Sequence, residues 1–74
     1  MGEIAKRAAA EIRRTAQEND LSYQTEFDIV GVSRNCLYEW EHSYSEPTAK
    51  KLAGLALAGY DIYYILTGQR RGGA

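Results

Sequence analysis

The sequence predicts a compact all-α domain of five short helices, because three of its features agree. Apolar side chains recur at the spacing of a helix face, and no segment alternates polar and apolar residues as a half-buried strand does. Glycines and capping residues divide the chain into short runs. A length of 74 residues allows one domain. We therefore expect a domain over residues 1–68 and a flexible C-terminal tail over residues 69–74, which carries two arginines and two glycines.

Capping residues predict where each helix begins and ends. The first helix is expected over residues 3–18, where good helix formers are frequent, and Asn19-Asp20 ends it. The residues expected to cap the N-termini of the four later helices are Ser22, Ser33, Thr48 and Asp61. The third helix is expected to end near Glu41, and Pro47 precludes regular helix just before it. The glycines expected to end the second, fourth and fifth helices are Gly31, Gly59 and Gly68.

Each expected helix has apolar residues that could face a common core. In chain order they are Ile4, Ala8, Ile12 and Ala16; Phe27, Ile29 and Val30; Leu37 and Trp40; Leu52, Ala53, Ala56 and Leu57; and Ile62, Ile65 and Leu66. Because apolar residues make up 45% of the chain, such a core can form without disulfides or metals.

Composition argues against several classes of protein. Cys36 is the only cysteine and His42 the only histidine, so the sequence offers no disulfide, no metal cluster and no base paired with a nucleophile. We expect no enzyme activity, no cofactor, no bound metal and no small-molecule substrate. No apolar stretch approaches the roughly 20 residues of a membrane-spanning helix, and no apolar run follows the charged N-terminus as in a signal peptide. A cytoplasmic protein is expected.

Two segments carry a resemblance to a known family. The stretch LSYQTEFDIVGVSRNCLYEWEHSYSEP from Leu21 resembles the helix-turn-helix of phage Cro and lambda-repressor-like proteins, and GYDIYYILTG (59–68) resembles the final helix of phage repressor N-terminal domains. Together they cover most of residues 11–68. The resemblance implies a lambda-repressor-like fold and a phage-type or prophage-type transcriptional regulator that binds a double-stranded DNA operator. It fits either a complete Cro-like protein or the N-terminal domain of a longer repressor.

The resemblance also implies which residues meet DNA. In this family the third helix lies in the major groove and its N-terminal residues contact base edges. By position, the base-contacting residues would be Arg34, Asn35 and Glu39, whose side chains can pair with guanine, adenine and cytosine respectively. The other groove or phosphate contacts would be Ser33, Cys36, Tyr38, Tyr23, Gln24, His42, Ser43 and Tyr44.

The residues of the last helix predict a second interface, a contact between two copies of the chain. Aromatic and aliphatic side chains crowd it, more than one short helix can bury, and aromatic residues are enriched where proteins meet. The residues expected at a twofold homodimer contact are Tyr60, Ile62, Tyr63 and Tyr64. A twofold dimer would bind an inverted repeat with half-sites about 10 bp apart.

The chain departs from the family pattern at several positions. Phe27 stands where a small residue is usual, and Glu26 where an apolar residue is usual, so the second helix could be shifted or rotated. Ala16 stands where an arginine often pairs with the glutamate after the tryptophan, so Glu41 needs another partner, for which Arg13 is the candidate. Ser43 replaces a frequent glycine, and a left-handed backbone there would carry modest strain.

Charge supports a different function. Between residues 18 and 46 the chain carries seven acids and one base, Arg34, which gives a net charge of −6 in the segment proposed to meet phosphates. The acids are Glu18, Asp20, Glu26, Asp28, Glu39, Glu41 and Glu46. The alternative is therefore a protein-binding module on the same scaffold, an antirepressor or decoy, whose acidic surface engages a partner protein.

Overall fold

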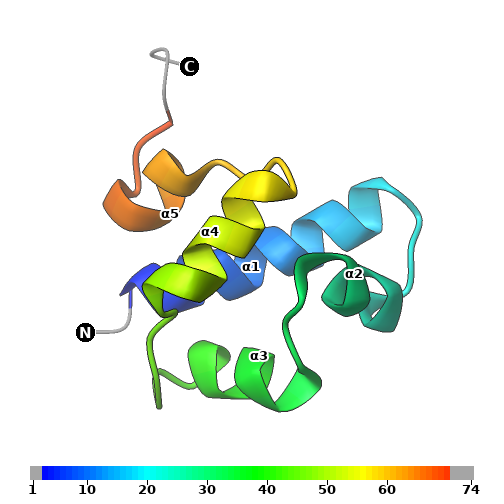
Figure 1. The fold of residues 1–74 in the computed structure, drawn as a ribbon, viewed down its shortest axis with the longest axis horizontal. Helices are drawn as coiled ribbons and strands as arrows, with labels where there is room; N and C mark the ends of the chain where they lie inside the picture. Colours follow the sequence, from blue (N-terminus) through cyan, green and yellow to red (C-terminus); the bar gives the residue numbers. More distant parts are fainter. Residues whose placement is uncertain (1–2, 71–74) are drawn as a thin grey trace.

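Five α-helices occur in residues 3–70, the part of the chain that the computed structural model describes. They are α1 (Glu3–Glu18), α2 (Tyr23–Val30), α3 (Arg34–Glu41), α4 (Ala49–Leu57) and α5 (Ile62–Thr67). Figure 1 shows α1 running through the middle of the domain, and α2, α3 and α5 all pack against it. Residues 3–70 contain no strand. The expected all-α class with five helices is confirmed.

The expected N-caps are all in place. The side-chain oxygens of Ser22, Ser33, Thr48 and Asp61 each accept a hydrogen bond from the backbone N–H three residues later, at 3.0 to 3.2 Å. These bonds satisfy amides that the first helical turn leaves without a partner. At the other ends of α2 and α5, Gly31 and Gly68 adopt left-handed backbone angles, with φ of 73° and 81°. These local interactions explain why the helix ends follow the sequence-based expectation so closely.

The core forms around one alanine-rich face of α1. Ala5, Ala8, Ala9 and Ile12 are fully buried there, and small side chains allow neighbouring helices to approach α1 closely. The buried residues that the other elements contribute to this core are Phe27, Val30, Val32, Leu37, Trp40, Leu55 and Ile65. The core is therefore built mainly on contacts to α1.

Helix α4 faces the core differently from the sequence-based expectation. Leu55 is its one fully buried residue and Leu52 packs beside the core, whereas Leu57 is 91% exposed. Ala53 and Ala56 are also exposed, so the expected inner stripe of α4 is wrong at Ala53, Ala56 and Leu57 and right at Leu52. The physical reason is the rotation of the helix: Gly54 lies against α2, where an added Cβ would be 3.6 Å from the Val30 carbonyl oxygen.

Two further apolar expectations are wrong for a similar reason. Ile29 and Leu66 are exposed, although both were expected to face the core. In α2 the inner face is occupied by Glu26, Phe27 and Val30, which leaves Ile29 on the outside. In α5, Ile65 takes the fully buried position, and the next residue points elsewhere because successive helical residues differ by about 100°.

Arginines attach the C-terminal part of the chain to α1. The Arg7 guanidinium donates from Nε to the Ile65 carbonyl oxygen at 2.8 Å and from Nη2 to that of Leu66 at 3.1 Å, which caps the end of α5. Arg70 donates to the buried Glu11 at 3.3 Å and lies 3.8 Å from the Tyr64 ring centroid. In the expected flexible tail, Arg70 thus has defined partners, while residues 71–74 lie outside the described residues.

Candidate nucleic-acid interface

Helices α2 and α3 are joined by a three-residue turn, Gly31-Val32-Ser33. The Val32 amide donates to the Phe27 carbonyl oxygen at 3.0 Å, and the Val32 side chain is buried in the core. Ser33 then caps α3 with its own side chain. The turn therefore holds the start of α3 rigidly against α2, at one edge of the domain (Figure 1).

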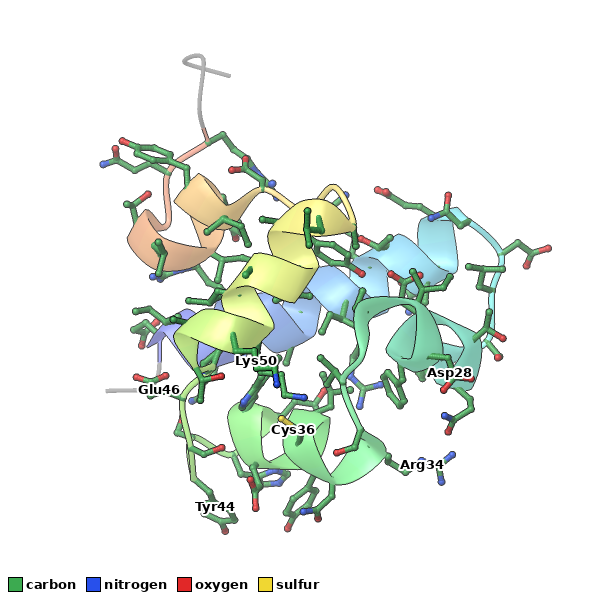
Figure 2. The ribbon with its side chains drawn as sticks, viewed as in Figure 1. Asp28, Arg34, Cys36, Tyr44, Glu46 and Lys50 are labelled. Atoms are coloured by element: carbon green, nitrogen blue, oxygen red, sulfur yellow. The ribbon has the colours of Figure 1, made fainter. Side chains whose placement is uncertain are left out.

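Arg34 and Asn35 lie on the exposed first turn of α3. Neither side chain makes a hydrogen bond or an ion pair to another residue within the range 3–70. Figure 2 shows Arg34 extending away from the domain at this end of the helix. Of the three residues expected to contact bases, these two are thus available to a ligand, and they present donors and an acceptor suited to base edges.

Glu39 and Cys36 are more constrained than the sequence suggested. A Glu39 carboxylate oxygen accepts a hydrogen bond from the Ser45 hydroxyl at 3.2 Å, which ties Glu39 to the loop after α3. Cys36 is half-buried and packs against the core, and Figure 2 shows its sulfur between α3 and α4. Burial also raises the pKa of the Cys36 thiol. The orientation of Cys36 therefore argues against its expected contact with a groove.

Three rings form an exposed cluster at the far end of α3, which we call the aromatic cluster: Tyr38, His42 and Tyr44. The ring centroids of Tyr38 and His42 are 4.1 Å apart, and those of His42 and Tyr44 are 5.7 Å apart. The Tyr44 side chain is 71% exposed and points away from the domain in Figure 2. Between the last two rings, Ser43 has φ of 60°, the left-handed conformation considered from the sequence. The sequence-based contacts at this end of α3 thus lie together on one surface.

The start of α2 brings Tyr23 and Gln24 to the surface. The Tyr23 hydroxyl accepts a hydrogen bond from Gln17 Nε2 at 3.1 Å, and the Arg13 guanidinium lies 4.8 Å from the centroid of the Tyr23 ring. Gln24 Nε2 donates to Asp28 at 3.1 Å. Tyr23 is therefore fixed from the α1 side, and the N-terminal amides of α2 lie beside it.

Arg13 is the functional candidate that sequence reasoning did not select. It was expected only as a possible partner of Glu41, and that pairing is confirmed: Arg13 Nε and Nη2 both donate to the Glu41 carboxylate, the second at 3.0 Å. Glu41 accordingly raises the pKa of Arg13. The residues lining an adjacent pocket of about 230 Å³ are Arg13, Tyr23, Phe27, Arg34, Leu37, Tyr38 and Glu41. Two guanidinium groups therefore border one pocket between α2 and α3, although 21 residues separate them in sequence.

Most of the acids between residues 18 and 46 have partners. Glu41 pairs with Arg13, Glu18 pairs with Arg14 at 2.7 Å, and Glu46 accepts the Ala5 amide at 3.2 Å. Glu26 is only 3% exposed and accepts a hydrogen bond from the Tyr60 hydroxyl. Lys50, which is exposed, adds a positive charge at the start of α4. Two of the seven acids are thus paired with arginines and a third, Glu26, is buried.

The residues expected at a dimer contact are mostly occupied within the domain. Tyr60, Ile62 and Tyr64 are half-buried and pack against the core, and Tyr64 also carries Arg70 on its ring. Tyr63 is exposed. Three of the four residues expected at a dimer contact thus also have partners within the domain.

Tyr60 gives the domain a predicted sensitivity to alkaline pH. Burial and the hydrogen bond to Glu26 raise the Tyr60 pKa above its ordinary value. The folded state therefore favours the protonated phenol, so this contribution to stability is complete below about pH 10, the pKa of an unfolded tyrosine, and is lost as pH rises above it. In urea titrations at pH 8 and at about pH 11, we expect wild-type protein to lose more stability than Tyr60→Phe. Equal losses would contradict the expectation.

Comparison of the chain with protein-family models, curated proteins and solved structures gives no match. Within residues 3–70 no three metal-ligating side chains gather in one place, and no helix there has the length and apolar character needed to cross a membrane. The class that fold and surface define is a five-helix all-α domain with an exposed helix, α3, held by a short turn to α2.

Proposed function

We propose that this protein binds double-stranded DNA in a sequence-specific manner, as a Cro-like or repressor-like transcriptional regulator of phage type. In this proposal α2, the turn and α3 act as a helix-turn-helix, with α3 in the major groove. The observation that carries the proposal is the exposure of Arg34 and Asn35 on the first turn of α3. Neither side chain has a hydrogen-bond or ion-pair partner within residues 3–70. An arginine can bind guanine O6 and N7, and an asparagine can bind adenine N6 and N7, each through two hydrogen bonds.

Contacts to the DNA backbone would come from both sides of α3. On one side lie the backbone amides at the start of α2 and the Tyr23 side chain. The pocket bordered by Arg13 and Arg34 is on the same side. On the other side are the aromatic cluster and the exposed Lys50. Because half or more of protein–DNA hydrogen bonds go to phosphates and sugars, these flanking groups would orient α3 and make binding salt-dependent.

We further propose that the protein acts as a homodimer on an inverted repeat. The large apolar side chains exposed on α4 and α5 are Leu57, Tyr63 and Leu66. A dimer would be expected to select two half-sites about 10 bp apart, whereas a monomer would select a single half-site. The length of the DNA site recovered in a selection therefore distinguishes a dimer from a monomer.

A selection from random duplexes at low salt tests the proposed function. We expect wild-type protein to enrich one motif, and Arg34→Ala to lose about 1–3 kcal/mol of affinity and relax the preference at one base pair. Lys6→Ala is the matched control, because Lys6 is exposed on α1, makes no ion pair in the described part of the chain, and carries the same charge. It should keep the base preference.

Absence of enrichment at any salt concentration, with the protein folded, would refute the proposal. The protein-binding alternative would then be tested by capture of a partner protein, with Tyr38→Ala and Asp28→Asn as the variants expected to weaken it. Among the acids on which this alternative rested, Glu26 is buried, and Glu18 and Glu41 pair with arginines. Asp20, Asp28 and Glu46 are exposed.

A further inference from the structure

A buried polar contact joins α2 to the connection between α4 and α5. The Tyr60 hydroxyl, which lies in that connection, donates to the Glu26 carboxyl group on the inner face of α2. Thr15 of α1 lines the same small pocket as Tyr60. Three segments that are distant in sequence therefore meet around the Tyr60 side chain. Glu26 is one of the two buried charged residues of residues 3–70, and the other, Glu11, is held by arginines.

Stability alone does not account for this contact. Burying a carboxyl group and a phenol costs free energy that their hydrogen bond only offsets, and an apolar pair of similar volume is often as stable or more so. A hydrogen bond differs from apolar packing because it is directional. It is therefore suited to selecting one rotation of α2 about its axis, where an apolar residue at position 26 would permit several.

The rotation of α2 matters because Tyr23 lies one turn before Glu26 on the same side of the helix. Tyr23 packs on Arg13, and Arg13 in turn holds Glu41 of α3. A change in the rotation of α2 would move Tyr23 and the N-terminal amides of α2 relative to Arg13. It would thereby alter the pocket between α2 and α3 that Arg34 borders.

We propose that the Tyr60–Glu26 hydrogen bond is a positioning contact that sets the rotation of α2, and with it the position of Tyr23 in the pocket that Arg13 and Arg34 border. This inference rests on the proposed function, but the rotation of α2 can be measured without DNA. Tyr60 and Glu26 touch no DNA themselves. They are positioning residues, which act through Tyr23 and Arg13.

The test compares the double variant Glu26→Leu/Tyr60→Phe with Glu26→Gln. The double variant replaces the polar pair by apolar side chains, whereas Glu26→Gln keeps both the size of the side chain and an oxygen that can accept the Tyr60 bond. Residual dipolar couplings of backbone amides in free protein give the orientation of α2 relative to α1. Urea titrations give the stability of each variant, and binding of random-sequence duplex at several salt concentrations gives the number of phosphate contacts.

We expect the double variant to stay as stable as wild type, to show α2 in a changed orientation, and to bind DNA about tenfold more weakly with a salt slope lower by about one. Glu26→Gln should match wild type in all three measurements. An unchanged orientation of α2 in the double variant would overturn the inference, whatever its DNA affinity.

Two outcomes separate the inference from the proposed function. Wild-type protein that binds no DNA would refute the function, while the couplings would still decide whether the contact sets α2. If the double variant does not fold, Tyr60→Phe alone removes the donor while keeping the ring, and the same couplings apply to it. An α2 orientation in Tyr60→Phe identical to that of wild type would then overturn the inference.

Discussion

Replacement of Trp40 by alanine is expected to remove roughly half of the protein's free energy of unfolding. Trp40 is 1% exposed, is the largest fully buried side chain in residues 3–70, and belongs to the core that α3 shares with α1. Truncation of a buried tryptophan costs about 3–5 kcal/mol, because transfer free energy is lost and a cavity remains. Domains of this size are stable by only about 4–11 kcal/mol.

Far-ultraviolet circular dichroism in urea measures the effect, since Trp40 is the only tryptophan and its fluorescence disappears with it. Tyr44→Ala is the matched control, because Tyr44 is also aromatic and follows α3 but is exposed. It should change the free energy of unfolding by less than about 0.5 kcal/mol. A Trp40→Ala protein as stable as this control would show that α3 is not packed as described.

The second large effect is expected within α4. Leu55→Ala should cost about 2–5 kcal/mol, because Leu55 is 0% exposed and shares the core with α1 and α5. Leu57→Ala removes the same atoms two residues later from a side chain that is almost fully exposed, and should cost less than about 0.5 kcal/mol.

Urea titrations of the two α4 variants, measured in parallel, test the rotation of this helix. The sequence pattern placed Leu57 among the core-facing residues and left Leu55 out. A large loss of stability is therefore expected from Leu57→Ala in that orientation and from Leu55→Ala in the structure. A large loss in Leu57→Ala with a small loss in Leu55→Ala would support the orientation that the pattern predicted and contradict the structure.

The candidate interface was predicted in part. Arg34 and Asn35 were selected by their position in the family resemblance, and with Ser33 as the N-cap both lie exposed on the first turn of α3. Glu39 and Cys36 could not be judged in the same way. Their orientation depends on Ser45 and on α4, which lie outside the helix that carries them. Arg13 was missed as a part of the interface because nothing in the α1 sequence indicates that α2 and α3 pack beside it.

The amino-acid sequence by itself determined the helices and their ends. Ser22, Ser33, Thr48 and Asp61 begin helices, and the glycines after α2 and α5 end them, through hydrogen bonds and backbone angles that span only a few residues. Such interactions are nearly independent of the rest of the fold, so they can be inferred without it.

Only the tertiary structure decided which way each helix faces and which charges find partners. Glu26 meets Tyr60 across 34 positions, Arg13 meets Glu41 across 28, and Arg70 meets Glu11 across 59. A stripe of apolar residues on α4 is compatible with more than one rotation, and the choice depends on how α4 packs against α2 and the core. Helical periodicity sets the spacing of a face, but packing against distant residues selects the face that is buried.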